Sequence, residues 1–226
     1  MSVVLDRLRK NLVVSCQPVP EGPLDKPEIV AAFALAALDG GAVGLRIEGI
    51  ANMVAVRRVT DVPIIGLIKV DREDTPIRIS PLAEHVRGLI GAGADIVAVD
   101  ATDRVRPEPL ADLLAEIHAG GALAMADCAT IADGQNARDL GFDILGSTMS
   151  GYTGGPIPHE PDFALLRALA GLGRFVIAEG RYHTPAQAAE AIRAGADAVV
   201  VGSAITRPEH VTTWFADAIH NAGAAL

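Results

Sequence analysis

The strongest constraint on the fold is a pattern that recurs along the chain. A helix-like stretch ends at a glycine followed by Ala or Phe, and a short apolar run follows at once, as at 38–47, 91–100, 140–148 and 193–203. Glycine can adopt the left-handed conformation that ends many helices. The apolar runs are too short for helices and are rich in Val and Ile, so we expect them to be strands.

Extended over the whole chain, this pattern predicts eight strands separated by amphipathic helices. The strands are expected at about 12–17, 42–48, 62–70, 95–101, 123–127, 143–148, 174–179 and 197–202. The helices are expected near 27–40, 50–59, 81–92, 108–120, 131–140, 162–171, 185–194 and 208–221. A further short helix, around 3–10, is expected to plug or flank the bottom of the barrel that these strands would form.

Strict alternation of strand and helix predicts a parallel sheet, and eight units favour closure into a (β/α)8 barrel. No Pro- or Ser-rich linker divides the chain, so we expect one domain over residues 1–226. An open doubly wound sheet is the alternative. It calls for a G-x-G-x-x-G turn after the first strand, where this chain has Cys16-Gln17-Pro18.

Charge and hydropathy exclude several classes of partner. The formal net charge of -9 argues against a general nucleic-acid binder and against an anionic membrane surface. No apolar run reaches the roughly 18 residues that span a bilayer, and the N-terminus lacks the pattern of a signal peptide. The two cysteines form no disulfide framework, so we expect a cytoplasmic protein. Trp214 and Phe215 are expected to pack the last helix onto the barrel or onto a partner subunit.

In this fold, polar residues at the C-terminal ends of strands are candidates for function, because the loops there converge over the barrel mouth. The predicted strand ends carry Gln17, Arg46, Glu48, Lys69, Asp71, Asp100, Asp127, Thr148, Glu179, Arg181, Gly202 and Ser203. A single carboxylate among them could equally be half of an ion pair. Several charges of both signs that converge on one mouth favour a site.

The last two strand ends are typical of a phosphate site. Loops after strands seven and eight commonly hold phosphate with backbone N–H groups, and glycine lets the backbone approach closely. Gly180, Gly202 and Ser203 occupy these positions, and Arg207 follows within one turn. Tight turns would also explain each glycine taken alone. Their joint placement favours phosphate, with Arg207 adding a charge-assisted hydrogen bond.

Lys69 and Glu179 are the candidates for proton transfer. Each ends an apolar run, PIIGLIK and RFVIAE, so each side chain is expected at the barrel mouth. Burial disfavours an ammonium group and can make the amine a usable base. A lysine that only neutralises a phosphate or an aspartate is the alternative. Glu179 could supply the matching acid or base.

Several stretches together resemble the N-acetylmannosamine-6-phosphate 2-epimerase family. The specific ones are the IKVD of residues 68–71, the SGYT of 150–153, IAEGRYHTPAQA at 177–188 and VVVGSAITRPEHVTTWF at 199–215. The resemblance implies interconversion of N-acetylmannosamine 6-phosphate and N-acetylglucosamine 6-phosphate, a step in amino-sugar and sialic-acid catabolism. It implies no cofactor and no metal.

The resemblance also implies roles for particular residues. Lys69 and Glu179 match the proton-transfer pair. Gln17, Arg46 and Asp127 match sugar contacts, and Gly180, Gly202, Ser203 and Arg207 match the phosphate site. Two positions depart from the family pattern. Cys128-Ala129 stand where Ser-Thr is expected, and Leu82 stands where Thr is expected.

The sequence leaves alternatives for the mechanism and for the function. The lysine could act alone or with the glutamate. The protein could be another sugar-phosphate epimerase or synthase on this fold, which a metal at Asp71 or Asp100 would favour, or a binder without catalysis. The expected partner is a small phosphorylated amino sugar, and homo-oligomers are compatible with the sequence.

Overall fold

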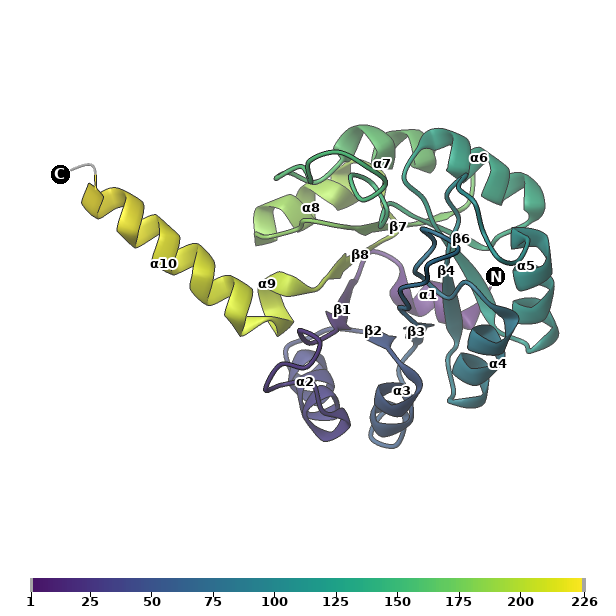
Figure 1. Ribbon diagram of the computed structural model, residues 1–226, viewed down its shortest axis with the longest axis horizontal. Coiled ribbons are helices and arrows are strands. Elements are labelled where there is room, and N and C mark those ends of the chain that lie inside the picture. The colour runs from purple at the N-terminus through teal and green to yellow at the C-terminus, as the bar shows by residue number, and fades with distance from the viewer. Residues whose placement is uncertain (1, 225–226) are drawn as a thin grey trace.

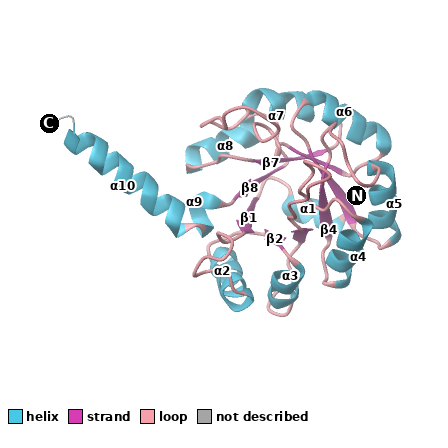
Figure 2. Ribbon diagram, viewed as in Figure 1, coloured by secondary structure: helices cyan, strands magenta, loops and turns pink. Residues whose placement is uncertain are grey.

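Eight parallel strands pair in chain order around a closed ring in the computed structural model, which describes residues 2–224 (Figure 1, Figure 2). The strands are β1 (Leu12–Cys16), β2 (Gly44–Glu48), β3 (Ile64–Leu67), β4 (Ile96–Asp100), β5 (Leu123–Asp127), β6 (Ile144–Gly146), β7 (Phe175–Glu179) and β8 (Ala198–Val201). Because β1 also pairs with β8, the open-sheet alternative is wrong and the (β/α)8 barrel is confirmed.

The helices follow the predicted alternation, with one addition. They are α1 (Val3–Leu8), α2 (Pro27–Asp39), α3 (Ile50–Arg57), α4 (Ala83–Gly91), α5 (Leu110–Ala119), α6 (Ile131–Leu140), α7 (Phe163–Ala170), α8 (Pro185–Arg193), α9 (Ser203–Thr206) and α10 (Pro208–Ala224). The four-residue α9 was not predicted. Among residues 2–224, no helix is long and apolar enough to cross a membrane.

Two apolar layers hold the barrel together, because successive strand residues point to opposite faces. In β4, Ile96 and Ala98 belong to the cluster inside the barrel, whereas Val97 and Val99 belong to the layer between strands and helices. Leu8 of α1 is fully buried within the inner cluster, so the first helix closes the barrel's lower end as expected.

Strand β3 is shorter than predicted, for a physical reason. The sequence favoured a strand over 62–70, but the regular strand ends at Leu67. The loop after it turns back, and Ile79 forms an antiparallel bridge with Lys69 while its carbonyl accepts from the Asp100 N–H (3.0 Å). The returning loop therefore takes the place beside β4 that a longer β3 would occupy. Lys69 lies on this hairpin and not on the strand itself.

The last helix departs most from expectation. Figure 1 shows α10 leading away from the barrel wall, while α2 to α8 surround the barrel. Phe215 and Ile219 of α10 are 67% and 72% exposed. The centroid of the Trp214 ring lies 4.6 Å from that of the His183 ring, in the loop before α8. Phe215 is therefore not packed on its own barrel wall, whereas Trp214 touches the barrel at His183. Packing onto a partner subunit, the other expectation, stays a prediction.

Candidate active site

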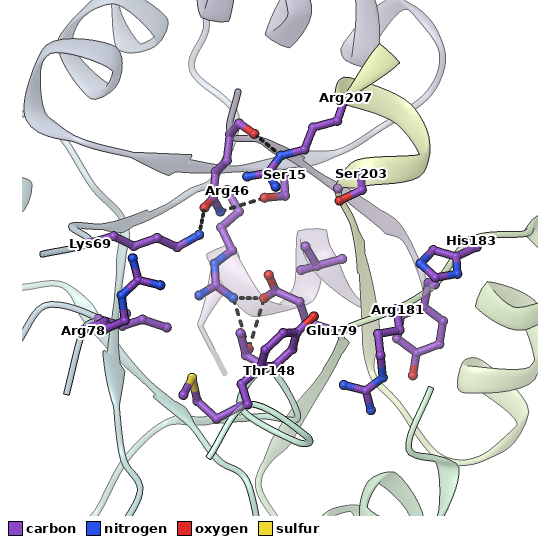
Figure 3. Close-up of a pocket in the computed structure, with 18 of the residues that line it drawn as sticks. Ser15, Arg46, Lys69, Arg78, Thr148, Glu179, Arg181, His183, Ser203 and Arg207 are labelled. Carbon is purple, nitrogen blue, oxygen red and sulfur yellow. Dashed lines mark hydrogen bonds and ion pairs between the residues drawn. The ribbon is translucent and has the colours of Figure 1, made fainter. Parts of the chain in front are cut away.

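The C-terminal ends of the strands surround a pocket of about 410 Å³, a volume typical of small-molecule sites. Side chains from different strands and loops point into it (Figure 3). Eight of the nine residues predicted for the site line the pocket: Gln17, Arg46, Lys69, Glu179, Gly180, Gly202, Ser203 and Arg207. The ninth, Asp127, is fully buried and bonded to Arg46.

Arg46 is the central charge of the site. Its side chain is 1% exposed, and its Nη2 donates to Asp127 Oδ2 at 2.6 Å, while its Nη1 pairs with the Glu179 carboxylate. Thr148 completes the group, because its hydroxyl donates to Asp127 Oδ1 (2.7 Å) and accepts from Arg46 Nη1 (3.2 Å). A buried arginine that spans two carboxylates fixes both of them in place. The strand-end charges thus form one network.

Lys69 faces the pocket from the hairpin after β3. Its side chain is open to the solvent of the pocket, yet the protein around the amine lowers its pKa to about 8. Desolvation is the main cause, and repulsion from Arg46 and Arg207 adds to it. A neutral amine is therefore accessible near neutral pH, as a general base requires.

The Lys69 amine has one close hydrogen-bond partner. Its Nζ donates to Gln17 Oε1 at 2.6 Å, and Gln17 Nε2 in turn donates to Ser15 Oγ at 2.8 Å. Gln17 lies just beyond β1, so β1 and the β3 hairpin meet at the amine (Figure 3). The sequence pattern placed Gln17 at the mouth but did not predict this contact.

The predicted phosphate residues lie together at one end of the pocket. Gly180 has φ +112°, which other residues rarely adopt, and a Cβ on Gly202 would come within 3.3 Å of Ser15 Cβ. These two glycines keep the wall open where backbone N–H groups could approach an anion. Arg207 borders the same wall, and its Nε donates to the Gln17 carbonyl at 2.7 Å.

Two other strand-end acids are engaged elsewhere. Asp100 is fully buried, accepts from Arg104 (2.7 Å) and from the Thr102 hydroxyl (2.6 Å), and its pKa is raised chiefly by burial. Asp71 pairs with Arg78 on the rim. Within residues 2–224, no three His, Cys, Asp or Glu side chains are grouped to hold a metal ion.

Sequence reasoning missed six polar lining residues, namely Ser15, Arg78, Arg104, Tyr152, Tyr182 and His183. Ser15 could have been found, because it stands two residues before Gln17, and residues two apart point to the same side of a strand. The others come from loops, and Tyr182 and His183 lie in the loop between β7 and α8. Their path over the mouth carries no periodic signal.

The comparisons with known proteins agree with this geometry. The family model described as "Putative N-acetylmannosamine-6-phosphate epimerase" matches residues 30–221. A solved N-acetylmannosamine-6-phosphate 2-epimerase from Clostridium perfringens superposes with a TM-score of 0.92 at 41% identity, covering 94% of this chain and 95% of that one. An Escherichia coli K12 relative that carries the 2-epimerase name is 59% identical over 94% of this chain and 93% of its own length.

This chain belongs to the N-acetylmannosamine-6-phosphate epimerase family. A bifunctional NanE/NanK enzyme from Brucella melitensis is also 59% identical over 97% of this chain, but the match covers 42% of that protein. The chain therefore spans less than half the length of the Brucella relative. Lys69, Glu179 and Arg207 all fall within the range that the family model matches.

The departures from the epimerase pattern do not reach the pocket. Cys128 is fully buried in the layer between strands and helices, as expected of a packed thiol, and neither it nor Ala129 lines the pocket. Leu82 is the N-cap of α4 and supplies no side-chain hydrogen bond. The Glu108 carboxylate accepts from the Ala83 N–H at 2.7 Å, so one of the free N–H groups at the start of α4 is satisfied from outside the helix.

Proposed function

We propose that this chain interconverts N-acetylmannosamine 6-phosphate and N-acetylglucosamine 6-phosphate by proton transfer at C2. The observation that carries the proposal is one pocket lined at once by the Lys69 amine, the Glu179 carboxylate and the glycine wall beside Arg207. Inversion at C2 requires a base for a weakly acidic C–H and a group that holds the developing negative charge. Family membership supports the choice of substrate.

Each group has a distinct role in the proposal. Lys69, as the neutral amine, removes the C2 proton. The positive charge of Arg46 stabilises the negative charge that develops on the substrate oxygen next to C2. Glu179 delivers or relays a proton on the opposite face. Gly180, Gly202, Ser203 and Arg207 bind the 6-phosphate and hold C2 at the base.

The deciding assay is direct. Incubation of the purified protein with N-acetylmannosamine 6-phosphate should give the gluco epimer. Proton NMR follows the conversion. Turnover should be unchanged with a chelator present. Loss of turnover with the chelator would favour a metal-assisted sugar-phosphate epimerase instead. Binding of the sugar phosphate without any turnover would favour a non-catalytic binder.

We expect the phosphate to contribute to turnover as well as to affinity. N-Acetylmannosamine without phosphate should lose roughly 10²–10⁴ in kcat/KM, because two or more charge-assisted hydrogen bonds would no longer orient C2. A fall in kcat as well as a rise in KM should appear in steady-state kinetics. Similar efficiency on both sugars would contradict the assignment of the glycine wall and Arg207.

We also propose that the chain forms a homodimer through α10. Helices α2 to α8 surround the barrel, whereas α10 leads away with Phe215 and Ile219 exposed. Beside the uncovered sector, α8 buries only Ala191 and α2 leaves Leu35 42% exposed. The α10 of a second copy offers the apolar face that this sector lacks.

Sedimentation should accordingly give a mass twice the 23.4 kDa of one chain. The change Phe215→Glu should shift the mass to that of one chain, because a carboxylate would be buried in the interface. Val3→Glu is the matched control, since Val3 is 83% exposed and lies on α1, and it should leave the mass unchanged. A wild-type mass of 23.4 kDa would contradict the dimer.

A further inference from the structure

The residues that support Lys69 form a chain of contacts that begins inside β1. Ser15 is 5% exposed and Gln17 is 8% exposed, so both side chains are effectively buried. Gln17 bonds to Ser15 at one end of its amide and to Lys69 at the other. Neither residue is needed to explain the fold, because the barrel's ring of backbone pairs is complete without these side chains.

The direction of these bonds follows from the groups involved. An ammonium has only donors, so the Gln17 atom that meets Lys69 in its charged form must be the amide oxygen. The amide nitrogen then faces Ser15, whose hydroxyl oxygen accepts from it. The Ser15 hydroxyl thus holds the far end of the amide, while the donors of the ammonium select the oxygen end for Lys69. If the Ser15 hydroxyl is removed, the amide loses the contact that keeps it against the amine.

The same segment is tied to the phosphate end of the pocket. The Thr206 hydroxyl donates to the Ser15 carbonyl at 2.7 Å, and Arg207 Nε donates to the Gln17 carbonyl at 2.7 Å. Two adjacent residues at the end of α9 thus hold the backbone of the two residues that support Lys69. Arg207 and Lys69 thus both bond to Gln17, the first at its backbone carbonyl and the second at its side chain.

We propose that Ser15 and Gln17 are positioning residues for the proposed reaction, and that they set the place and the basicity of the Lys69 amine. The inference rests on the proposed function of Lys69 as base. A carbonyl that accepts from the amine favours its charged form. Desolvation and the positive charges of Arg46, Arg207 and Arg78 favour the neutral amine. The Glu48 carboxylate favours the charged form, as Gln17 does.

Two nearly isosteric changes at Gln17 should shift the pKa of Lys69 in opposite directions. Gln17→Glu places a carboxylate on the amine and should raise the Lys69 pKa by about 1 or more, whereas Gln17→Leu removes the acceptor and should lower it. Ser15→Ala should lower the Lys69 pKa as Gln17→Leu does, but by less, because the amide remains and loses only the contact that holds its far end. A residue that merely supported the fold would not produce opposite signs.

The measurement does not depend on activity. The chain has only three lysines, Lys10, Lys26 and Lys69, so protein labelled with 13C-lysine gives three Cε signals that can be titrated by NMR and assigned with Lys→Arg variants. The midpoint for Lys69 should lie near 8 in the wild type and move as stated. Lys10 and Lys26 serve as internal controls whose midpoints should not move.

Kinetics then link the titration to the reaction. The acidic limb of the pH profile of kcat/KM should move in parallel with the Lys69 midpoint in all three variants, each checked for an unchanged melting temperature. A Lys69 midpoint that is unchanged in Gln17→Glu and Gln17→Leu would overturn the inference. Shifted midpoints in a protein without epimerase activity would overturn the proposed function and leave the positioning role intact.

Discussion

Replacement of Lys69 by either Ala or Arg is expected to abolish epimerisation while the barrel still folds. Arginine keeps the positive charge but is effectively always protonated, so it cannot remove a proton. We expect kcat to fall by about 10²–10⁴ or more in both variants, since that is the usual contribution of general acid–base catalysis. The measurement is the rate of gluco epimer formation by proton NMR, with circular dichroism to verify the fold.

Lys26→Arg provides the matched control, because Lys26 is exposed, is the N-cap of α2 and does not line the pocket. It should keep full activity. In the wild type, kcat/KM should rise with pH up to about 8 and then level, because the neutral amine becomes the main form above its pKa. Near-normal turnover in Lys69→Arg would show that the lysine supplies charge only and that the base lies elsewhere.

Glu179→Gln is expected to separate exchange from inversion. The amide keeps the shape of the side chain and can still bond to Thr148, but it can neither accept nor return a proton. Inversion should therefore fall by about 10²–10⁴. In D2O, Lys69 could still remove the C2 proton and return a deuteron to the same face, so the unconverted substrate should gain deuterium at C2.

The readout for Glu179→Gln is the deuterium content of both epimers over time, by NMR or mass spectrometry. Wild-type protein in D2O should give product that carries deuterium at C2. If Glu179→Gln epimerises at nearly the original rate, Lys69 acts as a single base and the carboxylate serves only to hold Arg46. The two outcomes resolve the alternative that the sequence left open.

Most of the barrel could be predicted from the sequence, because each strand–helix unit is marked by residues within that unit. Each helix-ending glycine and each Val- and Ile-rich run marks its own unit, and all eight strands appear where such a run stands. The strand ends then place Arg46, Asp127 and Glu179 on one mouth, since parallel strands share a direction. Fold rules of this kind require no knowledge of side-chain contacts.

The parts that could not be predicted depend on contacts distant in sequence. Strand β3 was expected to reach residue 70, yet pairing of the returning Ile79 with β4 is a tertiary event. The contact of Lys69 with Gln17 joins residues 52 positions apart. The course of α10 was also beyond reach, because its apolar residues fit packing on its own barrel and packing on a second copy equally well.

The position of Lys69 on a hairpin outside the strand has a consequence for how the protein loses function on heating. The Lys69 segment is held within its own loop by bonds from Val70 N–H to the Arg78 carbonyl and from Ser80 N–H to the Ile68 carbonyl. Outside the loop it is held by a few side-chain and backbone bonds, to Asp100, Glu48, Gln17 and Val105. These few bonds can open without breaking the ring of strands, as local openings in proteins commonly do. We therefore expect loss of activity on heating to precede global unfolding, because Lys69 can leave the mouth while the barrel stays closed.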